Sequence, residues 1–577
     1  MNYKELYEEW LSNPCFDEET KAELKAISND ENEIKERFYQ ELEFGTAGLR
    51  GIIGAGINRM NIYTVRKATQ GLANYILKTG GANKGVAIAY DSRRMSPEFA
   101  DVAALCLNAN GIKAYVFESL RPTPELSFAV RELQCIAGIN ITASHNPPEY
   151  NGYKVYWEDG AQITPPHDTG IMEEVKAVTD FAGLKTMEKE EAVKAGLYIV
   201  IGEDIDDKYI AELKKQVKRQ DCIDAAKKEL KIVYTPLHGT GNVPARRILK
   251  ELGFENVYVV SEQELPDGEF PTVSYPNPEA AEAFELALKL AKEKDADLVL
   301  ATDPDADRLG VYVKDAKSGE YITLTGNMSG CLLADYEIGQ IKEQRGIPED
   351  GALIKTIVTT NMADAIAKYY GVQLIEVLTG FKYIGQQILG FEQSGTGEYL
   401  FGFEESYGCL IGTHARDKDA IVATMALCEA AAYYKTKNMT LWDAMLAMYE
   451  KYGYYKDDIQ SITLKGIEGL NKIQEILETL RNDTPKKFGK YKVLSARDYK
   501  KDTIINTVTG EEKPTNLPKS NVLYYDLEDD AWLCVRPSGT EPKVKFYYGV
   551  KGSSLEEANA LSAELGKEVI DMINHMM

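Results

Sequence analysis

Short apolar runs alternate with longer amphipathic stretches along most of the chain. Residues 1–40 place apolar side chains at helical spacing among Glu and Lys, which predicts a helical N-terminal segment. Beyond it, the β-branched or apolar runs that predict strands are 85–90, 114–117, 136–141, 232–234, 257–260 and 298–301. Strands that alternate with helices in this way indicate α/β layers.

The pattern changes toward the C-terminus. From about Ile459, strand-like runs at 522–527, 531–535 and 544–548 follow one another closely, and a helical pattern begins at Ser554. This order predicts a separate α+β domain.

Charged stretches at 204–229, 315–320 and 451–458 interrupt the alternation and mark candidate junctions. A chain of 577 residues corresponds to about four domains at the usual size of about 150 residues each. We therefore predict four domains, which span residues 1–203, 204–317, 318–455 and 456–577.

The composition is that of an ordinary globular protein, with 44% apolar and 27% charged residues. The net charge of −24 repels phosphate backbones and anionic lipids, so we expect neither nucleic acid nor membranes as partners. The eight cysteines form no C-x-x-C pair, and we expect them to be reduced. Because we find no apolar signal region and no long apolar span, we expect a cytoplasmic protein.

A serine follows one of the predicted strands directly. The run Cys135–Ile141 leads into Thr142-Ala143-Ser144-His145-Asn146-Pro147. A serine at the C-terminal end of a buried strand lies where open α/β sheets bind ligands. A lone serine in this position is also explained by a turn or a helix cap. Ser144 is therefore a candidate that needs support from other loops.

Three carboxylates at alternate positions follow the apolar run 298–301. Asp303, Asp305 and Asp307 crowd negative charge, which is costly without a cation, and oxygen ligands suit Mg²⁺ or Ca²⁺. An EF-hand is excluded, because Arg308 and Lys314 stand where it requires Gly and Glu. A solvated acidic turn is disfavoured by the apolar strand just before the triplet. We predict a Mg²⁺ site that a phosphate on Ser144 can complete.

Two further loops have ligand-binding composition. In Val535–Lys543, Arg536 can clamp a phosphate, Gly539 permits close backbone approach, and Ser538 and Thr540 supply hydroxyls. An ordinary turn between two strands explains this segment equally well. Residues 403–408 offer carboxylates and a hydroxyl to sugar hydroxyl groups, or form a charged surface. The loops 234–241, 379–382 and 416–419 are similarly ambiguous.

Taken in order, these loops resemble the α-D-phosphohexomutase family. The shared motifs are a T-A-S-H-N-P phosphoserine loop, a D-x-D-x-D metal loop, a G-E-x-S-type sugar loop and an R-x-S-G-T phosphate loop, with Phe403 where the sugar-loop pattern has Gly. The resemblance runs from about Phe44 to Tyr548 and is strongest to the phosphoglucomutase and phosphopentomutase branch. It implies an α/β fold of three similar mixed α/β domains plus a smaller C-terminal α+β domain around a central active-site cleft.

The resemblance also implies an activity. Phosphorylated Ser144 gives its phosphoryl group to a sugar monophosphate, the bisphosphate intermediate reorients, and its other phosphate returns to Ser144. With glucose phosphates, this chemistry interconverts glucose 1-phosphate and glucose 6-phosphate through glucose 1,6-bisphosphate, with Mg²⁺ as cofactor. Small sugar phosphates are then the expected partners.

The resemblance assigns roles to residues of these loops. Ser144 and the three aspartates would hold the metal, Arg50 and Arg308 would lie near the transferring group, and Glu404 and Ser406 would contact sugar hydroxyls. The residues that would grip the other phosphate are Arg536, Ser538, Gly539 and Thr540. Lys382 and Lys418, from the ambiguous loops, complete the predicted substrate-binding residues.

The general acid or base is the least determined role. Some members of the family have a histidine at the position of Gly408. Lys154 matches a family position near the reacting oxygen and is our first choice, and His145 is the second. A lysine base would need its pKa lowered by burial or by a cationic neighbour such as Arg50.

Four alternative functions use the same loops. A phosphopentomutase and a synthase of glucose 1,6-bisphosphate are sister activities. A phosphatase with a phosphoserine intermediate would release inorganic phosphate, whereas a mutase must exclude water. A sugar-phosphate binding protein that kept the cleft but lost turnover would have no need for both Ser144 and the aspartate triplet.

Overall fold

The computed structural model describes residues 2–42, 48–464, 466–538 and 543–576. The chain divides into two compact units, each built from several segments. The first comprises Met1–Thr325, Phe381–Thr396 and Ser406–Leu441, and the second Gly326–Gly380, Gly397–Glu405 and Trp442–Met577. Among the described residues, every helix is too short or too polar to cross a membrane.

Three capped helices open the chain, as the polar and apolar pattern predicts: α1 (Tyr3–Ser12), α2 (Glu18–Ala26) and α3 (Glu31–Phe38). The side chains of Asn2, Asp17 and Asp30 accept hydrogen bonds from the first helical N–H groups and so cap these helices. Aromatic rings hold the helices together, with Trp10 stacked on Phe16 at 4.1 Å.

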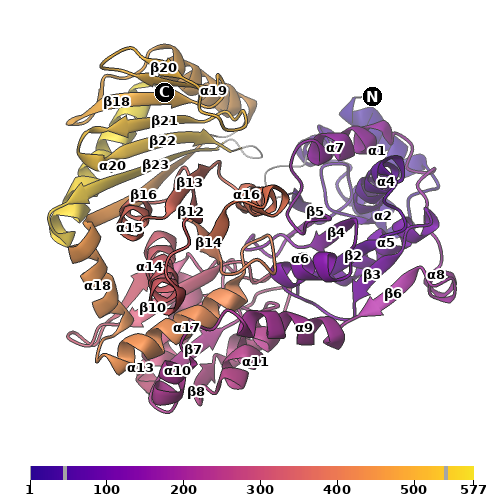
Figure 1. Ribbon diagram of the computed structural model, residues 1–577. Coiled ribbons are helices and arrows are strands. Elements are labelled where there is room, and N and C mark those ends of the chain that lie inside the picture. Colours follow the sequence, from indigo (N-terminus) through magenta and orange to yellow (C-terminus); the bar gives the residue numbers. More distant parts are fainter. Residues whose placement is uncertain (1, 43–47, 465, 539–542, 577) are drawn as a thin grey trace. The chain divides into compact units, whose positions relative to one another are not determined.

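The first sheet has the strand order β1-β5-β4-β2-β3-β6 (Figure 1). Strands β2, β3, β4 and β6 are parallel, and β5 runs antiparallel between β4 and β1. Its elements are β1 (Leu49–Ile52), β2 (Val86–Tyr90), β3 (Ala114–Phe117), β4 (Ala137–Ile141), β5 (Tyr150–Trp157), β6 (Tyr198–Ile201), α4 (Ile62–Thr79), α5 (Ser96–Ala109), α6 (Thr123–Glu132), α7 (His167–Ala177) and α8 (Lys189–Lys194). Every residue of β4 is buried, which explains why it is apolar except at Asn140, whose amide donates to the Thr123 hydroxyl at 2.6 Å.

The second sheet, also in the first unit, has the order β11-β10-β9-β7-β8. Its elements are β7 (Lys231–Thr235), β8 (Asn256–Val259), β9 (Leu298–Thr302), β10 (Leu309–Lys314), β11 (Tyr321–Leu324), α9 (Glu203–Lys214), α10 (Gln220–Ala226), α11 (Asn242–Leu252), α12 (Ser261–Glu264), η1 (Ala281–Phe284) and α13 (Glu285–Lys294). Three later elements join this unit: α16 (Phe381–Ser394), β15 (Gly408–Leu410) and α17 (Ala420–Thr436).

The second unit contains a parallel group of strands in which β12 lies between β13 and β14. This group consists of β12 (Gly351–Thr356), β13 (Gln373–Val377), β14 (Glu398–Glu404), α14 (Gly326–Arg345), α15 (Met362–Tyr370) and α18 (Leu441–Tyr452). The ring of Phe403 lies against α14 at Gly330, where an added Cβ would come within 2.1 Å of the ring. The glycine therefore provides the space for the aromatic residue that replaces Gly in the sugar-loop pattern.

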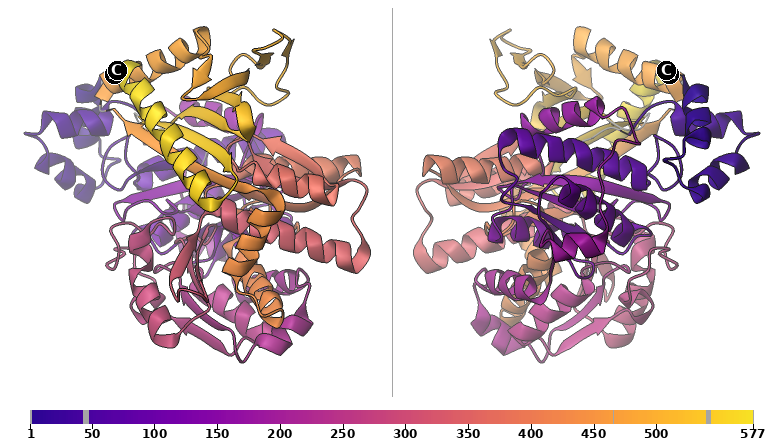
Figure 2. Two further views of the ribbon diagram at one scale, coloured as in Figure 1. Left: turned by 90° about the vertical axis from the view of Figure 1, so that its left-hand side faces the viewer. Right: turned by 90° about the vertical axis from the view of Figure 1, so that its right-hand side faces the viewer.

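The C-terminal part of the second unit is an antiparallel sheet in the order β16-β23-β22-β21-β18-β19-β20, with β17 beside β18. Helix α20 packs along β16 and β23 (Figure 2). The elements are β16 (Tyr454–Thr463), β17 (Lys487–Phe488), β18 (Tyr491–Asp498), β19 (Thr503–Asn506), β20 (Glu512–Lys513), β21 (Leu523–Leu527), β22 (Trp532–Pro537), β23 (Lys543–Gly552), α19 (Gly466–Asn482), η2 (Glu528–Asp530) and α20 (Leu555–Met576).

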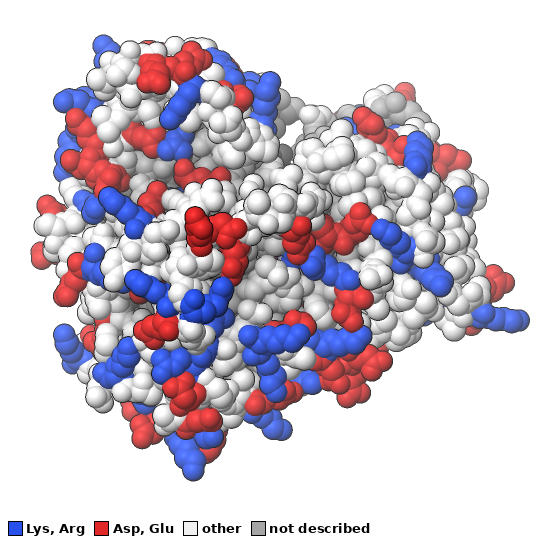
Figure 3. All heavy atoms as spheres, in the orientation of Figure 1, with Lys and Arg blue, Asp and Glu red and all other residues white. Residues whose placement is uncertain are grey.

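Charged side chains of both signs are interspersed on the face shown in Figure 3. Many of these charges form local ion pairs, such as that of Arg247 with Glu251. Exposed pairs of this kind contribute little to stability.

Candidate active site

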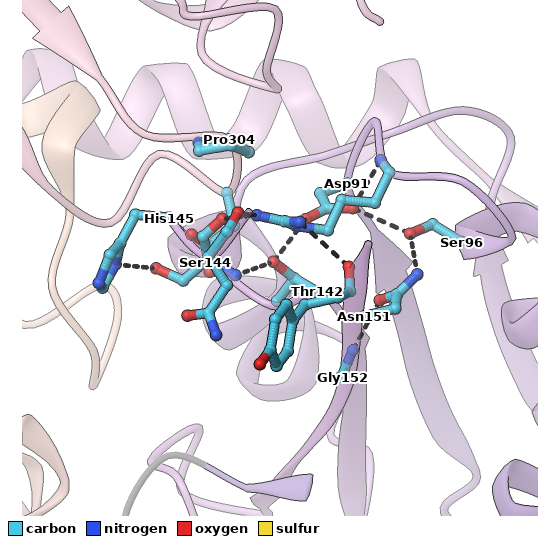
Figure 4. Close-up of polar contacts among 12 residues, drawn as sticks. Asp91, Ser96, Thr142, Ser144, His145, Asn151, Gly152 and Pro304 are labelled. Carbon is cyan, nitrogen blue, oxygen red and sulfur yellow. Dashed lines mark hydrogen bonds and ion pairs between the residues drawn. The ribbon is translucent and has the colours of Figure 1, made fainter. Parts of the chain in front are cut away.

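Ser144 lies three residues beyond the end of β4 and is 1% exposed. Its φ of 52° lies in the left-handed region, which is unfavourable for a serine. Hydrogen bonds hold this conformation: the Ser144 N–H donates to Thr142 Oγ1 at 2.8 Å, and the Thr142 hydroxyl donates to Asp91 Oδ2 at 2.6 Å (Figure 4). A strained, over-determined backbone of this kind is typical of functional sites.

Arg93 binds backbone carbonyl oxygens of the segment 142–150, which we call the serine loop. Its guanidinium donates to the carbonyl oxygens of Ser144 at 2.6 Å, Pro147 at 2.8 Å and Tyr150 at 3.0 Å, and also to that of Asn146. Asp91, at 3.3 Å from Arg93 Nε, balances the buried charge. Sequence reasoning missed Asp91 and Arg93, although a charged pair directly after the predicted strand 85–90 was a usable signal.

The Ser144 hydroxyl joins two chemical loops. Ser144 Oγ donates to Asp303 Oδ2 at 2.7 Å and lies 3.2 Å from His145 Nδ1. Burial, together with Arg308 and Arg50, lowers the pKa of His145 well below its ordinary value, so its imidazole is neutral. The hydroxyl therefore lies between a carboxylate and a potential proton acceptor.

Asp303, Asp305 and Asp307 form a buried carboxylate cluster after β9. One oxygen from each lies within 4.8 Å of the others. Burial raises the pKa of Asp303 well above its ordinary value, and the charges of Asp305 and Asp307 add to the effect. Asp305 Oδ1 and Asp307 Oδ1 are buried and accept no hydrogen bond from the described residues. Such unpaired oxygens in a repulsive cluster fit a small cation with a preference for oxygen ligands.

Two segments, at Thr123 and at 239–240, hold the backbone of the aspartate loop, residues 303–307. Thr240 donates its N–H and its hydroxyl to the carbonyl oxygen of Pro304, at 2.8 and 2.9 Å. Thr123 donates its N–H to the carbonyl oxygen of Asp305 at 2.9 Å and its hydroxyl to Asp305 Oδ2 at 2.7 Å. A Cβ at Gly239 would come within 2.4 Å of Pro304 Cα. The ambiguous loop 234–241 thus shapes the aspartate loop.

Two lysines neutralise part of the cluster. Lys154 Nζ lies 2.8 Å from Asp305 Oδ2 and 3.6 Å from Asp307 Oδ2, while Lys418 Nζ lies 3.2 Å from Asp307 Oδ2. Burial lowers the pKa of Lys154, but Asp305 and Asp307 outweigh it and raise the pKa above its ordinary value. The lowered pKa expected for a lysine base is therefore absent here, because the nearest charges are carboxylates.

The two predicted arginines lie beside the same loops. Arg50, on β1, donates from Nη1 to Asn146 Oδ1 at 3.0 Å, and its Nε is buried without a hydrogen bond among the described residues. Burial and the neighbouring Arg308 lower the pKa of Arg50. Arg308 Nη1 lies 2.7 Å from Glu279 Oε1. Positive charge is thus held next to Ser144.

Lys418 occupies the space that a side chain at position 408 would need. A Cβ on Gly408 would come within 2.1 Å of Lys418 Cδ. The ammonium is held by Asp417 Oδ1 at 3.0 Å, and Asp417 Oδ2 in turn accepts a hydrogen bond from the Tyr156 hydroxyl at 2.8 Å. Tyr156 and Asp417 were not among the predicted site residues, because nothing in their sequence spacing links them.

Other predicted residues belong to the second unit. Glu404 ends β14, and its Oε1 accepts a hydrogen bond from the Gly380 N–H at 3.1 Å. Arg536 lies on β22, and the Ser538 N–H donates to the carbonyl oxygen of Lys543 at 2.7 Å. Gly539 and Thr540 lie outside the described residues. Ser406 belongs to the first unit, which resumes there after Glu405, the last residue of a second-unit segment.

Lys382 forms no ion pair with the carboxylate cluster among the described residues, although the ring of its neighbour Phe381 lies 5.7 Å from the Lys418 ammonium. It is on α16, with Nζ 3.5 Å from the carbonyl oxygen of Ile163, and it lines a cavity at the opposite edge of the first sheet. Of the predicted residues in the first unit, the structure brings together Ser144, His145, Lys154, Arg50, Arg308, Lys418 and the three aspartates.

Family models for the four domains of phosphoglucomutase/phosphomannomutase match the chain in order. Alpha/beta/alpha domains I, II and III match residues 41–181, 207–319 and 325–452, and the C-terminal domain matches 489–566. The three α/β domains and the smaller C-terminal domain expected from the sequence are thereby confirmed as the fold class.

Relatives and solved structures agree with this match. A phosphoglucomutase of Staphylococcus haemolyticus (strain JCSC1435) is 36% identical over 90% of this chain and 92% of its own length, and one of Staphylococcus aureus (strain MRSA252) is 37% identical over 92% and 93%. The crystal structure of the Paramecium phosphoglucomutase parafusin, in an open form, has a TM-score of 0.68 at 20% identity, covering 92% of this chain and 96% of that one. A putative phosphomannomutase from Thermus thermophilus has a TM-score of 0.69 at 20% identity, covering 93% and 99%.

Proposed function

The chain belongs to the phosphoglucomutase/phosphomannomutase family and is a phosphohexomutase, an isomerase, and we propose from this premise that it interconverts glucose 1-phosphate and glucose 6-phosphate through phosphorylated Ser144. The observation that carries the proposal is the position of Ser144 Oγ, 2.7 Å from Asp303 in the carboxylate cluster and flanked by Arg50. A hydroxyl with only a structural role would not need three buried carboxylates beside it.

Each half-reaction exchanges one P–O bond for another. The bond from phosphorus to Ser144 Oγ breaks while a bond from phosphorus to a sugar hydroxyl oxygen forms, and the sugar hydroxyl gives up its proton. Lys154 and His145 remain the two candidates for proton transfer. The neutral imidazole of His145 has a free nitrogen lone pair, but the burial and the arginines that lower its pKa make it a weak base, whereas the Lys154 ammonium is suited to stabilise charge or to donate a proton.

The three aspartates would hold Mg²⁺ together with the phosphate on Ser144, and the bound ion would supply positive charge to the phosphoryl oxygens. Arg50 and Arg308 would orient the transferring group. Lys418 would contact the substrate beside Asp307.

The remaining proposed roles concern the sugar and the second phosphate. Glu404 and Ser406 would contact hydroxyls that both substrate orientations share. The proposed phosphate-binding residues are Arg536, Ser538, Gly539 and Thr540. Glucose 1,6-bisphosphate would serve as intermediate and activator.

Intact-mass analysis of freshly purified protein tests the phosphoserine. We expect a phosphate adduct in the wild type and none in Ser144→Ala. Ser92→Ala is a matched control, because the buried Ser92 hydroxyl has no hydrogen-bond partner among the described residues. Its adduct should persist. A wild type without adduct would favour a binding protein and overturn the proposal.

Turnover tests the substrate. Glucose 1-phosphate, mannose 1-phosphate and ribose 1-phosphate are each assayed with a trace of the matching bisphosphate. We expect the highest kcat/KM with glucose 1-phosphate and little inorganic phosphate. Faster turnover of ribose 1-phosphate would replace the hexose assignment with a phosphopentomutase, and phosphate release at a comparable rate would indicate a phosphatase.

A further inference from the structure

A cavity of about 860 Å³ lies in the first unit, at the edge of the first sheet opposite Ser144. Lys84, before β2, and Cys135, before β4, lie on its wall, as do Trp157 and one face of α16. In the pairing of β4 with β5, Trp157 is opposite Ala137, the first residue of β4, whereas Ser144 follows the last. The Trp157 end of the cavity and Ser144 therefore lie at opposite ends of β4, a five-residue strand roughly 16 Å long.

One cation in this cavity has no anionic partner. Lys84 pairs with Glu158, and Arg131 lies 3.5 Å from Glu392. Lys382 forms no ion pair with any carboxylate in the part of the chain that the structure describes; its ammonium lies 3.5 Å from the carbonyl oxygen of Ile163 and 5.4 Å from the centre of the Tyr383 ring. The third carboxylate on the wall, Asp159, accepts the Ala161 N–H through Oδ1 at 3.1 Å. Among the described residues, Lys382 is therefore left without a carboxylate partner.

The surroundings of Lys382 disfavour an unpaired ammonium. Burial lowers the pKa of Lys382, and the charge of Asp168 opposes this effect only in part. A partly buried ammonium regains stability when an anion pairs with it. An anionic ligand is therefore the partner that would stabilise the Lys382 ammonium.

The remaining wall combines apolar and amide groups. Ile163, Pro165 and Leu389 contribute apolar surface, and Trp157 stacks on His167 with ring centroids 4.4 Å apart. Gln162 and Gln386 add amide donors and acceptors. Apolar walls with a few polar groups, and volumes of roughly 300–1,000 Å³, are typical of sites for small organic molecules.

We propose that this cavity binds a small organic anion, a ring that carries a phosphate or a carboxylate, with the anionic group on the Lys382 ammonium and the ring on the apolar wall of Ile163, Pro165 and Leu389. The site is distinct from the sugar-phosphate site and does not depend on Ser144. It also gives a role to Lys382, which forms no ion pair with the carboxylate cluster among the described residues.

Calorimetric titration of the full chain with phenyl phosphate and with benzoate tests the proposal, and phenol serves as the neutral comparison. We expect saturable binding of at least one anion and much weaker binding of phenol. The tighter of the two anions identifies phosphate or carboxylate as the preferred group. Absence of saturable binding for both anions up to about 10 mM, equivalent to a binding free energy weaker than about 3 kcal/mol, would overturn the proposal.

Three variants separate the effect of Lys382 from that of the general charge of the cavity. Lys382→Gln should weaken anion binding about tenfold or more, the equivalent of one charge-assisted contact. Lys84→Gln is the matched control and should change it less than about threefold, because Lys84 is already paired with Glu158. Lys382→Met, which keeps the apolar stem, guards against a packing effect and should match Lys382→Gln. Unchanged binding in both Lys382 variants would overturn the proposal.

Hydrogen exchange locates the bound anion independently of activity. We expect protection in peptides that cover residues 157–167 and 381–393. Protection confined to 142–150 would place the anion at the candidate active site instead and overturn the proposal. Loss of mutase activity in the preparation would leave these readings untouched, so a failure of the proposed function stays distinguishable.

Discussion

Because Gly408 has no side chain, the stem of Lys418 can pack against it. The stem of Lys418 fills the space above Gly408, and its ammonium reaches both Asp307 and Asp417. Family members with a histidine at this position would need a different path for the lysine. The glycine therefore belongs to the electrostatics of the site, although it carries no functional group.

Gly408→Ala should displace Lys418 from Asp307 and lower kcat/KM for glucose 1-phosphate about tenfold, the equivalent of about 1.4 kcal/mol of transition-state stabilisation. Steady-state kinetics measure the effect. Gly390→Ala is the control, since a Cβ there has nothing within 4 Å, and its kinetics should match the wild type. Unaltered kcat/KM in Gly408→Ala would show that the position of Lys418 is unimportant.

Asp457, on β16, predicts a pH effect on stability. Burial raises the pKa of its carboxyl to about 6, although Thr360 and Lys355 oppose the shift. The folded carboxyl thus binds its proton more tightly than the unfolded one, whose pKa is about 4. The free-energy cost of burying the ionised Asp457 carboxylate is absent below pH 4 and complete above pH 6. The contribution of Asp457 to the free energy of unfolding therefore falls by at most about 3 kcal/mol as the pH rises through that window.

Urea unfolding at pH 4, 5, 6 and 7 checks this effect by comparing the wild type with Asp457→Asn. The difference in unfolding free energy should change between pH 4 and 6 in favour of the variant, because its amide stays neutral. Other titrating groups cancel in the difference. A constant difference over this range would contradict the shifted pKa.

At the scale of elements, β5 connects the first sheet to two parts of the candidate site. It carries Lys154 to Asp305 and Tyr156 to Asp417, which lies just before α17. Tyr209, on α9, donates to Asp419 at 2.9 Å, and Asp419 caps α17. Two buried tyrosines therefore hold the segment around Lys418 from different elements.

Tyr156→Phe should lower stability by about 1–3 kcal/mol, because a buried carboxylate oxygen of Asp417 loses its donor. It should also lower kcat/KM, since Asp417 positions Lys418. Tyr209→Phe removes a comparable hydroxyl but leaves the partners of Lys418 in place. Denaturant unfolding and kinetics on both variants separate the two effects. Equal losses of kcat/KM would mean that the role of Tyr156 is purely structural.

The periodicity of the sequence predicted the buried parallel strands well. The run 136–141 became β4, and 298–301 became β9, because strands buried on both faces are continuously apolar. The antiparallel strand β5 was not predicted, since polar Asn151 and Lys154 interrupt its apolar run. Both polar side chains make buried contacts, Asn151 with Arg94 and Ser96 and Lys154 with Asp305, and at such positions local patterns are expected to fail.

Side-chain networks were the least predictable part of the site. The loop motifs identified Ser144 and the aspartates, because their chemistry is explicit in short segments. Asp91 and Arg93 reach the serine loop only because β2 lies beside β4, a pairing between distant segments. The roles of Gly539 and Thr540, the cytoplasmic location and the domain boundaries at 203, 317 and 455 stay predictions.

At the scale of the whole molecule, the charge distribution argues for a dependence on metal. The chain carries a net charge of −24, and three of its carboxylates are buried together. The neighbouring lysines leave two of their oxygens without hydrogen bonds from the described residues. A bound cation would stabilise the folded state, because the unfolded chain cannot assemble this cluster.

Mg²⁺ added to chelator-treated protein should raise the midpoint of thermal unfolding by a few degrees, since a ligand at 100 times its Kd contributes about 2.7 kcal/mol. Differential scanning fluorimetry measures the shift. Asp305→Asn should abolish it, whereas Asp315→Asn, in a surface turn outside the cluster, should keep it. A shift of equal size in both variants would place the metal elsewhere.

The grip of Arg93 on the serine loop has a consequence for redesign. The arginine binds carbonyl oxygens, which every amino acid provides, so the loop owes this part of its shape to none of its own side chains. Libraries that vary His145 and Pro148 while keeping Asp91 and Arg93 should therefore yield folded loops with altered proton transfer. Side chains of the serine loop can therefore be exchanged without loss of the backbone contacts to Arg93.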